Sequence, residues 1–337
     1  MKNYLLLFIL SLIVMGTSCE LGKPRAQGAD NELIIVSSEE HKNKISSLLS
    51  LVFNDTIFTP QPEPHFNQIW VTPDKFSDIK KNVNVIVANI GNDNKNDGTK
   101  LIKNILSAKQ YESSISGDNN LIFSQNVFAK DQNFLIINGP TTEKIINTAN
   151  EKGPWIEKQF DKLFVKRQSN YLLKGSSRQL ELEKSLALKY NWTMKIPWGY
   201  TIISDSSSND FFWMGREMPY RWLAVQWMEG LQFSDSLSAA KYSQKIPINY
   251  FNNIQYSNYY FDMQPYVFNE LGAWRITGLW ESSEDAQGGP FLSYLFYNPN
   301  DNRTYFIHTM IFYPGKEKFL LLKQLDIIAQ TFKTVLQ

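Results

Sequence analysis

The pattern of apolar residues changes along the chain, and this change constrains the fold more than any other feature of the sequence. Between residues 33 and 174, short β-branched runs alternate with segments whose apolar residues recur at helical spacing. Aromatic-rich strand patterns then dominate up to Phe319–Val335, which has the periodicity of an amphipathic helix. The sequence therefore predicts an α+β protein in two α/β sandwich-like parts, residues 33–174 and 175–337.

The expected elements differ between the two parts. In the first part, strands are expected at residues 33–37, 66–72, 83–90, 121–129 and 133–138, with helices between them and with Gly153-Pro154 breaking the last helical segment in two. In the second part, a helix is expected at residues 179–190. Strands are expected at residues 193–204, 211–217, 221–228, 273–280, 290–297 and 304–313, while residues 239–256 are irregular with one short helix. We expect the second part to be an antiparallel sheet covered by the C-terminal amphipathic helix.

The N-terminus has the layout of a secretory signal peptide. Residues 1–18 place Lys2 before the apolar run Leu5–Met15, and small residues follow that run. The run is shorter than the roughly 20 residues that a membrane-spanning helix needs. A small residue directly before Cys19 resembles the lipobox of bacterial lipoproteins, in which the cysteine accepts a diacylglyceryl group and then, on its freed amine, a further acyl chain such as palmitate.

Cys19 is the only cysteine of the chain, so it has no internal disulfide partner. This favours lipidation over the alternative, an ordinary secretory signal followed by a chance cysteine, even though Gly16 stands where a lipobox usually has Leu. Two or three acyl chains hold a protein stably at a membrane, because each buried CH₂ contributes about 0.8 kcal/mol. Residues 19–32 are polar with scattered Gly and Pro, which predicts a flexible tether.

The expected location is the cell envelope, with a lipid anchor in the membrane. Surface-exported lipoproteins of some bacteria carry an acidic cluster after the cysteine, and here only Glu20 is present. This favours the periplasm-facing side of the outer membrane.

Charge and composition exclude some classes of partner. Removing residues 1–18 takes away Lys2 and no acid, so 34 − 1 = 33 basic residues face 33 acidic ones. No basic cluster is visible, which argues against nucleic acid as the main partner. The aromatic share of 14% suits a large core, and it would also suit a surface that binds carbohydrate or peptide.

The sequence contains no recognisable catalytic, metal or cofactor motif. The three histidines, His41, His65 and His308, are isolated from one another and from Cys19, so no metal site is expected. No G-x-S-x-G elbow, phosphate-binding glycine loop or H-E-x-x-H motif occurs. We therefore assign no catalytic residue and no cofactor.

A carboxylate pair is the alternative basis for an activity. Glu217, Glu229, Glu270 and Glu281 lie near strand ends in aromatic surroundings, as in glycan-cleaving enzymes. Nothing in the sequence determines the distance between any two of them. The arginines of the same strand patterns are interpreted as partners of these acids rather than ligand clamps; they are Arg216, Arg221 and Arg275.

A candidate binding loop joins two strand patterns of the second part. Paired glycines permit positive φ or a close approach of two backbones. The alternative interpretation is a tight connection into the strand after the proline. The residues of the candidate loop are Trp280, Glu281, Gly288, Gly289, Pro290 and Phe291.

Four segments carry a family resemblance, namely GLWESSEDAQGGPFLSY (278–294), FYPGKEKFLLLKQLDIIAQTFK (312–333), NVFAKDQNFLII (126–137) and IPWGY (196–200). They resemble a family of uncharacterised bacterial lipoproteins classed as a domain of unknown function. The GLWE…GGPF…SY core is the most specific of them, and likeness is weakest over Tyr250–Leu271. The resemblance implies a membrane-anchored α+β protein in two parts, and it implies no activity.

The expected function is therefore that of a membrane-anchored envelope lipoprotein. It would bind or scaffold an envelope protein or a glycan without catalysis, and its membrane contact would be the acyl chains on Cys19. The alternative is a hydrolase of envelope glycans or peptides that uses a carboxylate pair.

Overall fold

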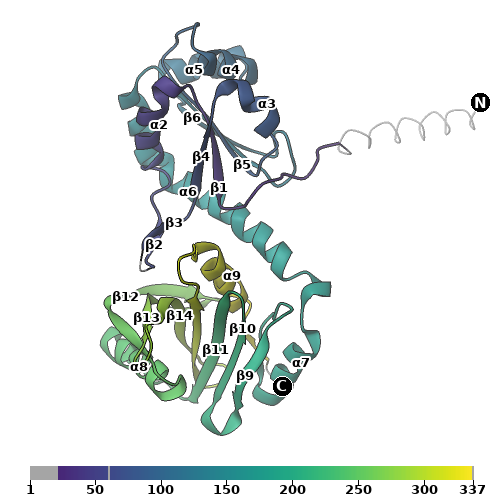
Figure 1. The fold of residues 1–337 in the computed structure, drawn as a ribbon, viewed down its shortest axis with the longest axis vertical. Coiled ribbons are helices and arrows are strands. Elements are labelled where there is room, and N and C mark those ends of the chain that lie inside the picture. The colour runs from purple at the N-terminus through teal and green to yellow at the C-terminus, as the bar shows by residue number, and fades with distance from the viewer. Residues whose placement is uncertain (1–21, 60, 336–337) are drawn as a thin grey trace, which may run out of the picture. The chain divides into compact units, whose positions relative to one another are not determined.

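The computed structural model describes residues 22–59 and 61–335, which fall into two compact units (Figure 1). The first unit holds the described residues up to Asn54 together with Phe66–Phe164. The second holds Asp55–His65 and the described residues from Val165 onward. The chain therefore passes between the units three times, and Asp55–His65 is an insertion that contributes to the second unit. The predicted signal peptide and Cys19 lie outside the described residues.

The first unit is built on a five-stranded sheet in the order β4-β1-β5-β7-β6. Its strands are β1 (Glu32–Val36), β4 (Asn67–Val71), β5 (Asn84–Ile90), β6 (Leu121–Gln125) and β7 (Asn133–Gly139). Four of them are parallel, and only the edge strand β6 runs antiparallel to its neighbour. β5 and β7 are nearly continuous apolar runs because a central parallel strand is covered on both faces.

Helices cover both faces of this sheet, giving three layers (Figure 1). One face packs against α2 and α6, and the other against α3, α4 and α5. Their bounds are α2 (Lys42–Leu49), α3 (Phe76–Ile79), α4 (Asp97–Ile105), α5 (Ala108–Ser116) and α6 (Thr142–Leu172). Alternate residues of β5 separate into the two cores, with Ile86 and Ala88 on the α2 side and Val85 and Val87 on the other.

The predicted break at Gly153-Pro154 is wrong, because α6 continues through both residues. Proline in a helix interior removes one backbone hydrogen bond, here to the Asn150 carbonyl, but the apolar face on both sides of it packs on the sheet. Gly153 permits this packing, since a Cβ there would lie 3.0 Å from the Leu51 carbonyl oxygen. Within the described ranges, no helix is both long enough and apolar enough to cross a membrane.

Part of the predicted flexible tether is ordered on the first unit, which corrects that prediction for residues 24–27. The Ala26 amide donates to the Lys130 carbonyl at 2.8 Å, and the Val83 amide donates to the Gln27 carbonyl at 2.9 Å. Ala26 is also buried in a small core with Ala129. Polar composition predicted flexibility here, but backbone groups form hydrogen bonds whatever their side chains are.

The second unit is built on a seven-stranded antiparallel sheet in the order β12-β13-β14-β15-β11-β10-β9. Its strands are β9 (Thr201–Ser206), β10 (Phe211–Arg216), β11 (Tyr220–Glu229), β12 (Ile254–Phe268), β13 (Leu271–Ser282), β14 (Gly288–Asn298) and β15 (Arg303–Phe312). Every pair of neighbours in this sheet is antiparallel.

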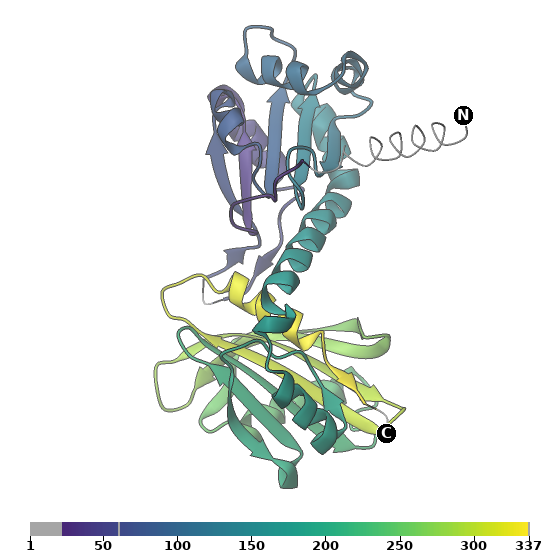
Figure 2. The ribbon, with the colours of Figure 1, turned by 90° about the vertical axis from the view of Figure 1, so that its right-hand side faces the viewer.

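The C-terminal helix α9 (Phe319–Ala329) lies across one face of this sheet, over β11, β14 and β15 (Figure 2). The predicted fold class is therefore confirmed: mixed helices and strands, with an antiparallel C-terminal sheet covered by the C-terminal helix. The same face also packs against α7 (Leu180–Tyr190) and the short ladder of β8 (Trp192–Thr193) with β16 (Lys333–Thr334). The opposite face packs against α8 (Ser236–Tyr250).

Two elements of the second unit differ from the sequence-based expectation. Residues 239–256 were expected to be irregular with one short helix, yet α8 has 15 residues and starts with a capping box at Asp235. The strand β12 was not predicted at all. Its burial does not alternate along the strand, its register shifts between Tyr256 and Phe261, and it contains Pro265, as an edge strand can.

Candidate functional site

The two glycines of the candidate loop are the first residues of β14, where they pair with Glu281 and Trp280 of β13. Neither glycine has a positive φ. A Cβ on Gly289 would lie 2.0 Å from the Ile311 carbonyl oxygen, and one on Gly288 would lie 2.7 Å from the Trp280 carbonyl oxygen. Close approach of backbones is therefore the reason for both glycines.

The aromatic residues of the candidate loop anchor it to the core between the sheet and α8. The Trp280 indole Nε1 donates to the Ile311 carbonyl at 3.1 Å, which Gly289 allows to come close. Phe291 is buried and stacks on Tyr256, with ring centroids 4.1 Å apart. These two side chains hold the loop in place, so that Glu281 and the glycine backbones border the cavity described below.

A hairpin of the inserted segment forms the facing wall. Its strands β2 (Thr56–Ile57) and β3 (Glu63–Pro64) have two residues each, and the sequence patterns did not predict them. Phe58 stacks on Tyr260 of β12, with ring centroids 4.2 Å apart and planes 25° apart. This contact attaches the hairpin to the edge of the seven-stranded sheet.

Glu63 of β3 attaches the same hairpin to α9. Its Oε2 accepts from the backbone amides of Lys318, at 2.5 Å, and Phe319, at 2.8 Å. Its Oε1 lies 3.5 Å from Lys318 Nζ. Lys318 itself supplies no side-chain cap to α9, so Glu63 satisfies helix amides that would otherwise have no partner and places a negative charge at the positive end of the helix.

Together the hairpin, β12, the β13–β14 turn and the segment before α9 enclose a cavity of about 1010 Å³. Four of the six candidate loop residues line it, namely Trp280, Glu281, Gly288 and Gly289, whereas Pro290 and Phe291 do not. Aromatic side chains at its border remain accessible, since Tyr259 is 91% exposed and Phe58 is 48% exposed.

Several polar residues that line this cavity already have partners. The Glu281 Oε1 accepts from Gln255 Nε2 at 3.1 Å, and Glu63 is paired with Lys318. The Ser257 hydroxyl accepts from the Tyr259 amide at 3.4 Å. The cavity therefore offers aromatic faces for stacking, together with Glu281 as a hydrogen-bonded carboxylate on its loop side.

The sheet topology separates the four glutamates considered as a carboxylate pair. Glu281 and Glu217 lie at one end of the sheet, three to four strands apart, which corresponds to about 14–19 Å. Glu270 and Glu229 lie at the other end, with a similar separation. Paired catalytic carboxylates need about 5–10 Å, so the fold does not bring any two of these glutamates together for that chemistry.

The histidines do not form a hydrolytic or metal site with their neighbours. His308 Nδ1 lies 2.6 Å from the Ser293 hydroxyl, its cross-strand partner, but both residues are fully buried in the α8-side core. Burial lowers the pKa of His308 to about 3, so the imidazole is neutral near pH 7. Among the residues that the structure describes, no group of three potential ligands could hold a metal ion.

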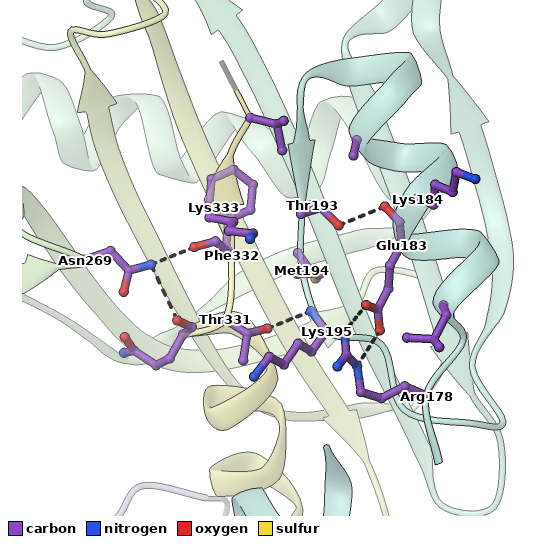
Figure 3. A pocket seen from close by; sticks show the side chains of 14 residues that line it. Arg178, Glu183, Lys184, Thr193, Met194, Lys195, Asn269, Thr331, Phe332 and Lys333 are labelled. Carbon is purple, nitrogen blue, oxygen red and sulfur yellow. Dashed lines mark hydrogen bonds and ion pairs between the residues drawn. The ribbon is translucent and has the colours of Figure 1, made fainter. Parts of the chain in front are cut away.

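A second cavity of about 740 Å³ opens between α7 and the β8–β16 ladder (Figure 3). Arg178 and Glu183 form an ion pair on its α7 side, and the Lys195 amide donates to the Thr331 hydroxyl at 2.8 Å. Lys195 and Lys333 also line this cavity, and neither forms an ion pair with a described residue. The sequence patterns did not predict this cavity, because its walls come from segments more than 100 residues apart.

Two family models match the chain, each over less than half of it. Residues 26–172 match Domain of unknown function (DUF8532), and residues 179–331 match Domain of unknown function (DUF4837). These matches fit the expectation of an uncharacterised family. None of the curated proteins matches the sequence.

Several solved structures share a limited likeness with the chain. The Ran-binding protein Mog1p of Saccharomyces cerevisiae has 11% identity and a TM-score of 0.32, with 43% of this chain and 90% of that protein covered. LpqN of Mycobacterium tuberculosis, described as involved in cell envelope biogenesis, has 11% identity and a TM-score of 0.29, with 43% and 83% covered. A protein of Bacteroides thetaiotaomicron has 9% identity and a TM-score of 0.27, with 44% and 46% covered. These TM-scores are low, and we infer no function from them.

Proposed function

We propose that this protein is a lipid-anchored binding protein of the bacterial cell envelope, attached through acyl chains on Cys19. Its partner, an envelope protein or a glycan, would bind without catalysis at the cavity between the β2–β3 hairpin and the β13–β14 turn. The observation that carries the binding role is the combination of accessible aromatic rings with polar groups that are already paired. Such a surface can stack on a ligand and has no pair of free carboxylates to cleave it.

The proposed location depends on the first nineteen residues of the sequence. A signal-like apolar run followed by the only cysteine of the chain supports lipidation. Two or three acyl chains on Cys19 would anchor the protein stably, because a single acyl chain binds a membrane only marginally and a second one makes the attachment stable. A periplasm-facing position at the outer membrane is the corresponding part of the proposal.

Metabolic labelling with a palmitate analogue tests the anchor. The wild-type protein should incorporate the label and fractionate with membranes, and Cys19→Ser should do neither. Label that persists after Cys19→Ser, or that never appears on the wild-type protein, would contradict lipidation at this residue. Separation of inner and outer membranes then tests the proposed position.

Cross-linking at the cavity border tests the binding role. A photoreactive phenylalanine analogue at Tyr259 should capture a defined partner in intact envelopes, whereas the same analogue at Tyr171 is the matched control. Tyr171 is also a highly exposed tyrosine of the second unit, and it does not line the cavity. Phe58→Ala should weaken capture at Tyr259 because it removes one wall of the cavity.

Identical products from the two positions would contradict a specific site at the cavity. Protease treatment of the captured material distinguishes the two partner classes, since a protein partner is digested and a glycan is not.

A further inference from the structure

Two arginines stand directly opposite each other at the end of the β10–β11 hairpin. Arg216 of β10 pairs in register with Arg221 of β11, so both side chains project from the same face of the sheet. This is the face covered by α9, because Met214 and Leu223, two residues away on each strand, belong to that core. Like charges in directly opposed positions destabilise an antiparallel pair, so this arrangement needs a compensating interaction.

Arg221 is buried without an acidic partner. Arg221 is 7% exposed. Its Nη1 donates to the neutral Gln324 Oε1 at 2.9 Å, and its Nε makes no hydrogen bond within the described chain. No described carboxylate lies within ion-pair distance of Arg216 or Arg221. Burial and then the charge of Arg216 lower the pKa of Arg221 from its ordinary value.

Tyr200 adds a third unpaired polar group beside the two arginines. It is 4% exposed, and its hydroxyl makes no hydrogen bond within the described residues. Burial raises the pKa of Tyr200 to about 12, although the charges of Arg221 and Arg216 act in the opposite direction. The phenol therefore stays protonated near pH 7 and can donate its proton to an acceptor.

Gly199 gives the backbone next to Tyr200 room to pass beside Arg216. Gly199 has a φ of +90°, and a Cβ there would lie 3.2 Å from Arg216 Nε. The neighbouring side chains Trp198 and Met218 are 73% and 88% exposed, and Arg216 is partly exposed. Arg216 can therefore be reached from solvent on this side, and Arg221 lies directly opposite it in the strand register.

We propose that Arg216, Arg221 and Tyr200 form a binding site for a phosphate group. All three groups can donate hydrogen bonds, and no carboxylate among the described residues pairs with either arginine, so the missing partner is an anion with several acceptor oxygens. A phosphate dianion balances two guanidinium charges, whereas a single carboxylate balances one. The planar guanidinium groups also match the oxygen spacing of a phosphate. This site is separate from the cavity of the proposed function and does not depend on it.

Titration of the full-length protein with sodium phosphate tests the site, by calorimetry and by thermal unfolding, against sodium chloride of matched ionic strength. We expect saturable binding and a rise in Tm that grows with the phosphate concentration, as for any ligand that binds only the folded state. Acetate of equal ionic strength should give a smaller rise in Tm. A larger response to acetate would overturn the assignment of phosphate.

Three variants separate a site from a general salt effect. Arg216→Gln and Arg221→Met should each weaken phosphate binding more than ten-fold, and Arg303→Gln, at the opposite end of the same sheet, should leave it unchanged. In phosphate-free buffer, Arg221→Met should raise Tm, because it removes an unpaired buried charge. Equal phosphate responses in the wild type and all three variants, or no response of the wild type, would overturn the proposal.

A second arm identifies where such a phosphate comes from. A soluble ligand is indicated if glycerol phosphate competes with inorganic phosphate and the protein does not bind vesicles of phosphatidic acid in phosphatidylcholine. Arginine-dependent binding to those vesicles, and not to pure phosphatidylcholine, indicates a lipid head group. Either result supports recognition of a phosphate group. If glycerol phosphate does not compete with inorganic phosphate and the vesicles do not bind, the proposal is overturned.

Discussion

Replacing Glu63 with alanine is expected to destabilise the second unit and to release its inserted hairpin. The carboxylate accepts from two backbone amides at the start of α9 and pairs with Lys318, and both side chains of this ion pair are only 11% exposed. One residue thus joins the β2–β3 hairpin to the C-terminal helix. The substitution would remove the helix cap, the ion pair and one wall of the cavity together.

The expected size of the effect follows from these contacts. Losing a helix N-cap costs about 0.5–2 kcal/mol. Removing one partner of a buried ion pair costs about 3–5 kcal/mol, because the other charge stays buried. Lys318 Nζ also donates to the Lys316 carbonyl at 2.6 Å, which leaves the ammonium a partner. We therefore expect about 3 kcal/mol for Glu63→Ala, and about half of that for Glu63→Gln, which keeps one acceptor oxygen.

Denaturant unfolding followed by tryptophan fluorescence measures this loss. Seven of the nine tryptophans belong to the second unit, so fluorescence reports mainly on that unit; they are Trp192, Trp198, Trp213, Trp222, Trp227, Trp274 and Trp280. Glu284→Gln is the matched control, because Glu284 lies exposed in the β13–β14 turn. It should change the unfolding free energy by less than about 0.5 kcal/mol.

Two outcomes would refute the reasoning. If Glu63→Ala unfolds at the denaturant concentration of the wild type, the carboxylate does not stabilise α9. If Glu63→Ala and Glu63→Gln lose equal free energy, the acceptor oxygen kept by glutamine contributes nothing to the cap. Limited proteolysis gives an independent measure, since a released hairpin should be cut within residues 55–65 sooner than in the wild type.

Two further predictions concern the second unit. His308 has a pKa of about 3 in the folded protein against 6.5 in the unfolded chain, so the unfolded state binds the proton first as pH falls. The free energy of unfolding should therefore be at its full value above pH 6.5 and fall by about 1.4 kcal/mol per pH unit as pH drops from 6.5 towards 3. The pH dependence of unfolding measured for the wild type and His308→Phe checks this, and an unchanged slope in the variant would contradict it. Gly289→Ala should cost about 3 kcal/mol or more, because its Cβ would lie 2.0 Å from the Ile311 carbonyl oxygen. In the same thermal-unfolding measurement Gly272→Ala, where nothing lies within 4 Å, is the control, and equal Tm values for both variants would disprove the steric argument.

The sequence predicted elements that bury a regular pattern of apolar residues. The runs at residues 83–90 and 133–138 became the central strands β5 and β7, because continuous β-branched residues suit a strand covered on both faces. The helical spacing from Phe319 predicted α9, but the expected end at Val335 is wrong, because the helix ends at Ala329 and Lys333–Thr334 form the strand β16. Local periodicity is sufficient to predict an element when one face of a helix or the whole of a strand is buried.

Elements held by distant contacts were missed. The β2–β3 hairpin has only four strand residues, and its position depends on Glu63, which bonds to a helix more than 250 residues away. The edge strand β12 has no regular alternation, because its register shifts between Tyr256 and Phe261 and long stretches of it are exposed or half-buried on both faces. No local pattern carries the information for such contacts.

The candidate site was only half accessible to sequence reasoning. The loop around Gly288 and Gly289 was singled out because paired glycines require a backbone explanation, and four of its six residues line the cavity. The facing wall of the cavity was not predicted, because it is formed by the inserted segment Asp55–His65, which lies more than 200 residues before the loop in the sequence. The interpretation of Arg216 and Arg221 as partners of nearby acids is wrong, since the register places them opposite each other instead.

The sequence by itself determined the α+β class, the antiparallel C-terminal sheet with its covering helix, and the prediction of a lipid anchor at Cys19. These depend on periodicity and on the order of residues along the chain, which are local properties. Only the tertiary structure decided that the segment around Phe58 and Glu63 joins the second unit, that four glutamates stay apart, and that two arginines meet. Those outcomes depend on strand register and on contacts between distant segments, which are set when the whole core packs.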